Sequence, residues 1–148
     1  MARVAKSVLV NYSAEQMFAL VDDVPAYPQF LPWCRSASAR IEDATTQLAT
    51  IHIDYHHIRQ SFTTRNRRSS VQRLDVELVE GPFRRLQGHW HFIALRADAC
   101  RVELELEYEF ATRMLERFIA PVFGYIANNL VDAFVRRAVQ LYGDKALP

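Results

Sequence analysis

The chain has 148 residues, of which 50% are hydrophobic and 24% are charged, and its formal net charge is +1. This length suits one domain, residues 1–148, and the composition excludes a disordered tail and a strongly basic nucleic-acid binder, so we expect no DNA partner. The N-terminus lacks the apolar stretch of a signal peptide, and no window reaches the roughly 18–20 uncharged apolar residues of a membrane span, which predicts a cytoplasmic protein.

The first two predicted elements are a strand and a short helix. Residues 3–10 contain β-branched residues in partial alternation, which is typical of a strand. Ser13 is a suitable helix N-cap, and Gln16 can return a hydrogen bond to it in a capping box. Pro25 follows soon afterwards, so we expect the helix to end at about Asp22.

The segment 24–34, VPAYPQFLPWC, combines three prolines with aromatic side chains. It is too broken for regular structure and too apolar for an ordinary surface loop. We interpret it as a candidate lid, centred on residues 27–33, over a cavity inside the domain.

From about residue 35 to residue 110 the pattern predicts one strand after another. The clearest strand is 101–110, RVELELEYEF, in which apolar residues alternate with four glutamates. Similar alternation marks 49–58, 71–80 and 85–95, and Gly81-Pro82 marks a turn. Strands with one wet face and short connections indicate an antiparallel meander that is covered on one side only.

Beyond residue 113 the apolar residues recur every three or four positions up to about residue 142, which predicts a helix roughly 40–45 Å long. Pro121 should kink this helix or mark the start of its main segment, and Gly143 is a suitable stop. Together the elements predict an α+β helix-grip domain, in which a curved antiparallel sheet wraps a long C-terminal helix. The expected apolar face of the helix contains Leu115, Phe118, Ile119, Val122, Ile126, Leu130, Phe134, Ala138 and Leu141.

Common catalytic and metal-binding motifs are missing from the sequence. It contains no GxSxG, HExxH or CxxC motif and no glycine-rich phosphate loop. The glutamates of 101–110 are interpreted as a solvated face that also discourages edge pairing. Cys34 and Cys100 lack metal-ligand spacing, and we expect reduced thiols there. Four strand histidines alternate with apolar residues and are interpreted as solvent-side rather than as metal ligands: His52, His56, His89 and His91.

Two features carry a functional interpretation beside a purely structural one. The aromatic residues fit a solid core and the walls of a cavity for an apolar ligand equally well. Arginines cluster in TTRNRRSS and after GPF, where we expect hairpin ends, and fit either a solvated surface or an anionic partner such as lipid headgroups or ribosomal RNA. These arginines are Arg65, Arg67, Arg68, Arg84 and Arg85.

Four stretches along nearly the whole chain resemble the coenzyme Q-binding START-domain family of the polyketide cyclase/START-like superfamily, a family that includes bacterial ribosome-association toxins. The stretches are YSAEQMFALVDDVPAYPQFLPWC (12–34), FTTRN (62–66), GPFRRLQGHWHF (81–92) and NNLVDAFVRRA (128–138). The resemblance implies a START-type helix-grip fold, in agreement with the pattern of elements.

The function that we rank first from this resemblance is non-catalytic binding of a hydrophobic ligand, a polyprenyl quinone such as ubiquinone. The protein would act as a lipid carrier supporting respiration, with no cofactor beyond the ligand and with peripheral contact to the inner membrane. Placement and periodicity then assign the cavity to Tyr27, Phe30, Leu31, Trp33, Trp90, Phe92, Phe118, Val122 and Ile126.

Two alternatives follow. The second function implied by the resemblance is association with the large ribosomal subunit, which would block subunit joining, with the five arginines as natural contacts. The third, from the wider superfamily, is polyketide cyclisation, for which the inward faces offer few polar groups beyond Tyr55 and Tyr108. Lipid binding ranks first because apolar residues are spread through the whole fold, whereas the basic patch is modest.

Overall fold

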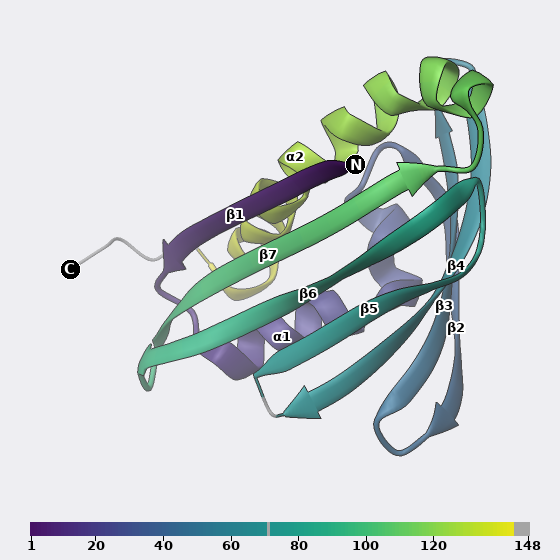
Figure 1. Ribbon diagram of the computed structural model, residues 1–148. Helices are drawn as coiled ribbons and strands as arrows, with labels where there is room; N and C mark the ends of the chain where they lie inside the picture. The colour runs from purple at the N-terminus through teal and green to yellow at the C-terminus, as the bar shows by residue number, and fades with distance from the viewer. Residues whose placement is uncertain (71, 144–148) are drawn as a thin grey trace.

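The computed structural model describes residues 1–70 and 72–143 (Figure 1). In chain order its elements are β1 (Ala2–Val10), α1 (Ala14–Asp22), the 3-10 helix η1 (Val24–Gln29), β2 (Cys34–Asp43), β3 (Thr46–Tyr55), β4 (Ile58–Ser70), β5 (Arg73–Glu80), β6 (Phe83–Arg96), β7 (Ala99–Phe110) and α2 (Arg113–Tyr142).

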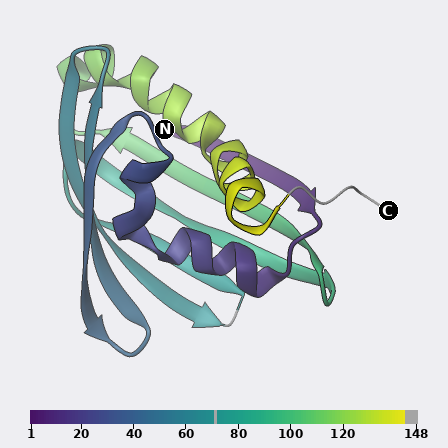
Figure 2. The same ribbon diagram turned by 180° about the vertical axis from the view of Figure 1, so that it is seen from behind.

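The strands of the described residues form one seven-stranded antiparallel sheet in the order β1-β7-β6-β5-β4-β3-β2. Strands β2 to β7 follow one another as a meander, and β1 pairs with β7, where Val4 lies opposite Leu106. The sheet is strongly curved, and α2 lies across its concave side together with α1 and η1 (Figures 1 and 2). The predicted α+β helix-grip architecture is confirmed.

The alternation along β7 determines which of its side chains enter the core. Its glutamates lie on the outer face of the sheet and are half-exposed. They do not protect a sheet edge, as the sequence suggested, because β7 lies between β1 and β6. The apolar residues between the glutamates are all buried: Val102, Leu104, Leu106, Tyr108 and Phe110.

Capping interactions fix the starts of both helices. In α1 the Ser13 hydroxyl accepts from the Gln16 backbone N–H at 3.0 Å, and the Gln16 side chain accepts from the Ser13 N–H at 2.9 Å, so the predicted capping box is confirmed. In α2 the Thr112 hydroxyl accepts from the Leu115 N–H at 3.1 Å. Pro121 lies inside α2 and does not begin it, because this cap fixes the start eight residues earlier.

Strand boundaries differ from the prediction around β4. The predicted strand 49–58 is two strands, because His56 and His57 form a turn with φ of 49° and 66° between β3 and β4. The stretch TTRNRRSS, expected at a hairpin end, lies inside β4. The predicted strand 71–80 begins at Arg73 as β5, and its first position, residue 71, lies outside the described residues.

The buried face of α2 is rotated relative to the predicted one. Phe118 and Leu141 are exposed, whereas Phe123 and Ala127, which the predicted face omitted, are buried. Within the described chain α2 is long and apolar enough to cross a membrane by length and composition, but 44% of its most apolar window is buried against the domain. The hydropathy of α2 is therefore accounted for by its position as the core helix.

Candidate ligand cavity

A partly enclosed, mainly apolar cavity lies between α2 and the concave face of the sheet. Its volume is about 100 Å³, which is below the roughly 300–1,000 Å³ of a typical small-molecule pocket. The interior of the domain is therefore mostly packed core with a small hollow. The hollow is lined by Val21, Val24, Tyr27, Trp33, Ala49, Ile51, Phe62, Thr64, Asn66, Leu74, Val76, Leu86, Trp90, Leu104, Leu106, Phe123, Ile126, Ala127, Leu130 and Phe134.

The segment η1 closes one side of the cavity by packing on Phe134 of α2. The rings of Tyr27 and Phe30 meet Phe134 edge-on, with centroids 5.3 and 5.2 Å away, and Trp90 meets it from the sheet at 5.4 Å. The Tyr27 hydroxyl donates to the Val21 carbonyl, and burial raises the pKa of Tyr27, so its phenol stays protonated. Aromatic packing of this kind makes η1 a fitted cover rather than a loose loop.

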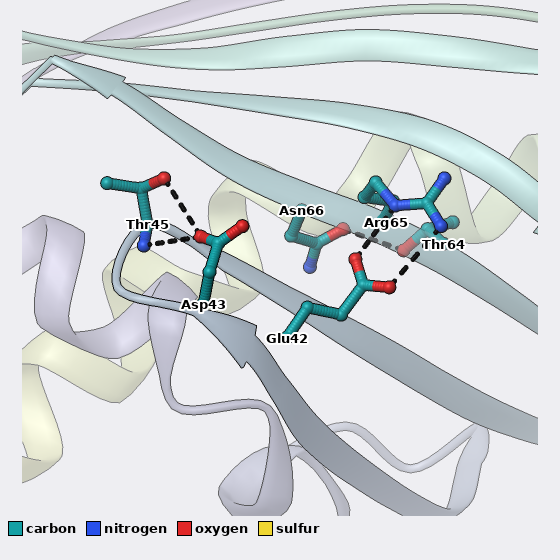
Figure 3. A network of polar contacts seen from close by, with 6 residues as sticks. All are labelled: Glu42, Asp43, Thr45, Thr64, Arg65 and Asn66. Atoms are coloured by element: carbon teal, nitrogen blue, oxygen red, sulfur yellow. Dashed lines mark hydrogen bonds and ion pairs between the residues drawn. The ribbon is translucent and has the colours of Figure 1, made fainter.

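Two polar side chains interrupt the apolar wall on β4. Thr64 and Asn66 are 4% and 7% exposed, and the Thr64 hydroxyl donates to Asn66 Oδ1 at 2.7 Å (Figure 3). They reach the cavity because alternation turns every second residue of β4 towards α2, with Arg65 between them on the outer face. Arg65 pairs there with Glu42 at 2.9 Å, and this hydrogen bond lowers the pKa of the Glu42 carboxyl (Figure 3).

The residues assigned to the cavity from the sequence fall into two groups. Tyr27, Trp33, Trp90 and Ile126 line it. The others surround it or lie elsewhere: Phe30, Leu31 and Phe92 pack behind the lining, Val122 is half-buried beside it, and Phe118 is 62% exposed on the outer side of α2. The assignment of Phe118 to the cavity wall is therefore wrong.

Sequence reasoning missed some lining residues that had a signal and others that had none. Leu104, Leu106 and Leu74 carried the alternation of their strands and could have been added on that basis. Thr64 and Asn66 carried no apolar signal, and their segment was interpreted as a turn.

The five arginines lie on strands rather than in turns. Arg65, Arg67 and Arg68 belong to β4, and Arg84 and Arg85 to the start of β6. Three of them have ion pairs: Arg65 with Glu42, Arg68 with Asp22 at 3.6 Å, and Arg84 with Glu109 at 3.2 Å. Among the described residues Arg67 and Arg85 are exposed without an ion pair.

Polar residues outside the cavity have structural partners. His89 and His91 lie 3.8 and 3.6 Å from Glu105 and Glu103 on the outer face, and His56 lies in a turn, so it does not share a strand face with His52. Residues 1–70 and 72–143 contain no group of three or more His, Cys, Asp or Glu side chains that could hold a metal ion.

The two cysteines are free and buried, and neither lines the cavity. Burial raises the pKa of each thiol to about 11, for Cys34 and for Cys100. Few thiolates therefore form at neutral pH, and these side chains are poor nucleophiles.

Comparison with known proteins agrees with this architecture. Residues 10–135 match the family described as "Polyketide cyclase / dehydrase and lipid transport". A relative from Vibrio cholerae, named ribosome association toxin RatA, is 41% identical over 97% of this chain and 100% of its own length. A relative from Xenopus laevis, named coenzyme Q-binding protein COQ10 homolog B, mitochondrial, is 24% identical over 97% of this chain and 61% of its own length.

Solved structures with the same fold include binding proteins and enzymes. A START superfamily protein from Mycobacterium smegmatis superposes with a TM-score of 0.78 at 22% identity, covering 94% of this chain and 98% of the other. The Zhui aromatase/cyclase from Streptomyces superposes with a TM-score of 0.73 at 18% identity, covering 97% and 99%. The chain therefore belongs to the polyketide cyclase/dehydrase and lipid transport family, and it has the START-type fold.

Proposed function

We propose that this protein binds an apolar ligand with a polar ring at one end, a polyprenyl quinone such as ubiquinone, and carries it without chemical turnover. The apolar cavity between α2 and the sheet is the observation that carries this proposal. Tyr27 is the one titratable side chain among the described lining residues, and its hydroxyl is bonded to a backbone carbonyl. The name of the Xenopus laevis relative supports the same ligand class.

A catalytic role in cyclisation has weaker support. Cyclisation needs acid–base groups within reach of the substrate. Tyr55 and Tyr108, the inward polar groups expected from the sequence, do not line the cavity: Tyr55 stacks on Tyr125 at 5.8 Å, and Tyr108 is buried among aromatic rings.

The size of the cavity limits how such a ligand could enter. A volume of about 100 Å³ accommodates a ring or a few isoprene carbons but not a polyprenyl chain. We propose that the ring occupies the cavity and that the tail leaves between α2 and η1, displacing the rings of Tyr27 and Phe30 from Phe134. Closure by ring packing alone suits a cover that opens at modest cost.

The start of α2 offers a surface on which a lipid carrier could collect its ligand. Met114 and Phe118 are 69% and 62% exposed, and Arg113 and Arg117 are exposed beside them. Apolar side chains flanked by cations suit contact with an anionic membrane. We therefore propose a cytoplasmic protein with peripheral membrane contact, and Phe118→Glu should reduce flotation with anionic vesicles.

Tryptophan fluorescence gives a direct test of ligand binding. Both tryptophans of the chain, Trp33 and Trp90, line the cavity. Titration with a short-chain ubiquinone should therefore quench most of the emission, and lipid extraction followed by mass spectrometry should find an isoprenoid quinone on protein purified from its native host. An unchanged emission and an extract without lipid would contradict the proposal.

A matched pair of helix variants makes this test specific to the cavity. Ala127→Leu adds three carbons to a side chain that lines the cavity, so it should weaken quinone binding at least tenfold. Asn128→Leu places the same side chain on the neighbouring, exposed position and should leave binding unchanged. Equal affinities of the two variants would show that the quinone binds elsewhere.

We propose ribosome association as a second candidate function. It is favoured by the RatA relative, which is 41% identical over nearly the whole chain. Arg67 and Arg85, exposed on the outer face of the sheet, are the natural contacts with RNA phosphates, because the other three arginines of the cluster have carboxylate partners.

Sedimentation of ribosomes separates this candidate from ligand binding. Wild-type protein in excess should shift subunits away from the joined ribosome, and Arg67→Glu with Arg85→Glu should abolish the shift. Arg136→Glu, a charge reversal at an exposed position of α2, is the control and should keep the shift. Unchanged subunit profiles with wild-type protein would remove this candidate, while quinone quenching would be unaffected.

A further inference from the structure

The pair of Thr64 and Asn66 is unusual because it places polar atoms in a wall that is otherwise apolar. A buried polar group costs stability unless its hydrogen bonds are satisfied. Leucine or valine at these inward positions of β4 would match the neighbouring Leu74 and Val76 of β5, which also line the cavity. Core packing alone therefore does not explain these two residues.

The hydrogen bonds of the pair leave one group unused. The Thr64 hydroxyl donates to Asn66 Oδ1, and the amide nitrogen of Asn66 lies on the side away from Thr64 (Figure 3). Among the described residues the Asn66 amide donates to no protein acceptor, and no side-chain nitrogen or oxygen without a partner is sealed from solvent. Two N–H donors are therefore held in place and available to a ligand.

Asn66 also lies at a boundary between two environments. It lines the apolar cavity, and it lines a polar hollow between α1 and the β2–β3 hairpin, which also contains Asp22, Asp43 and Arg68. A ligand with a polar end at Asn66 could extend its apolar body towards Trp90 in the same cavity. An anionic end would face Asp22 and Asp43, and the nearby cation Arg68 already pairs with Asp22 at 3.6 Å.

We propose that Asn66 determines the specificity of the cavity by donating a hydrogen bond to a neutral carbonyl oxygen at the polar end of the ligand. Thr64 is the positioning residue, because its hydroxyl fixes the orientation of the amide. The cavity then selects an apolar molecule that carries a ring carbonyl over a hydrocarbon or a fatty acid of similar size. This inference rests on the proposed function and names the chemistry that it recognises.

Two probes separate hydrogen bonding from apolar contact. One probe is a ubiquinone with a two-isoprene tail, followed by tryptophan quenching, and the other is an isoprenoid hydrocarbon of similar length, followed by its displacement of the quinone. Asn66→Leu should bind the quinone about tenfold more weakly, as expected for loss of one hydrogen bond, and should bind the hydrocarbon as tightly as wild type. Thr64→Val, which has nearly the same shape, should weaken quinone binding about threefold.

The outcomes distinguish this inference from the proposed function. If Asn66→Leu binds the quinone as tightly as wild type, or if both probes weaken equally, the specificity role of Asn66 is wrong while ligand binding stands. If wild-type protein binds neither probe, both proposals fall. Because leucine removes an unpaired buried donor, Asn66→Leu should unfold at the same denaturant concentration as wild type or higher, and a lower midpoint would indicate a structural role instead.

Discussion

The space between α2 and the sheet has a filled part and a hollow part. In the filled part Phe123 lies against Phe83 and Tyr108, with ring centroids 4.9 and 4.8 Å apart. In the hollow part the sheet and the helix contribute smaller side chains, among them Ala49 and Ala127. Both parts are enclosed by buried side chains, so side-chain volume, rather than hydrophobicity, decides where the cavity forms.

Phe123 stands between the two parts, and its removal should have the largest effect. It contacts the aromatic rings on one side and lines the cavity on the other. Phe123→Ala should lower the free energy of unfolding by about 3–5 kcal/mol, because the fixed rings around it cannot collapse into the space. Urea denaturation measures this value.

Phe118→Ala is the matched control on the same helix. Phe118 is 62% exposed, so its truncation should change the unfolding free energy by less than about 0.5 kcal/mol. Similar costs for the two substitutions would show that Phe118 is also packed in solution and that the comparison is wrong.

Two glycines give a second comparison of the same parts. Gly88 of β6 lies opposite Val76 and Leu106, which line the hollow, and a Cβ there would lie 2.1 Å from the Glu105 carbonyl oxygen. Gly88→Ala should therefore destabilise the protein by about 1–3 kcal/mol, because backbone and not a flexible side chain would have to move. The midpoint of urea unfolding reports the change.

Gly124 of α2 is the counterpart beside the filled part. A Cβ there meets the Tyr108 hydroxyl at 3.9 Å, an ordinary contact. Gly124→Ala should stabilise the protein by about 0.5–1 kcal/mol, since alanine favours the helix. The two substitutions should thus have opposite signs, and destabilisation by both would mean that the filled part has no spare room.

The sequence predicted the strands best where one face is wet and the other apolar. Residues 101–110 alternate without interruption, so both the strand β7 and its buried side chains followed from the period of two. In β4 the inward residues Thr64 and Asn66 are polar, which removed the alternation and made a strand resemble a turn. The residues proposed here to recognise the ligand therefore concealed the strand that carries them.

Other errors have separate physical causes. A period of three to four residues identified α2, but it could not show that Phe118 lies where the helix presents it to solvent rather than to the sheet. The turn between β3 and β4 uses His56 and His57 at positive φ, which L-residues other than Asn and Asp rarely adopt, so no glycine announced it. In both cases the decisive information is tertiary.

The smallest predicted effect concerns the thiols of Cys34 and Cys100, which lie outside the hollow in packed surroundings. Their pKa rises from an ordinary value of 9.0 to about 11 on burial, so the unfolded chain loses these protons first. Their contribution to stability is complete below pH 9 and should fall by about 1 kcal/mol per thiol between pH 9 and pH 10. Unfolding free energies measured across this range should therefore decline more gently for Cys34→Ala with Cys100→Ala than for wild type. An identical slope in the double variant would mean that solvent reaches both thiols, and the contrast between filled and hollow parts would then no longer hold.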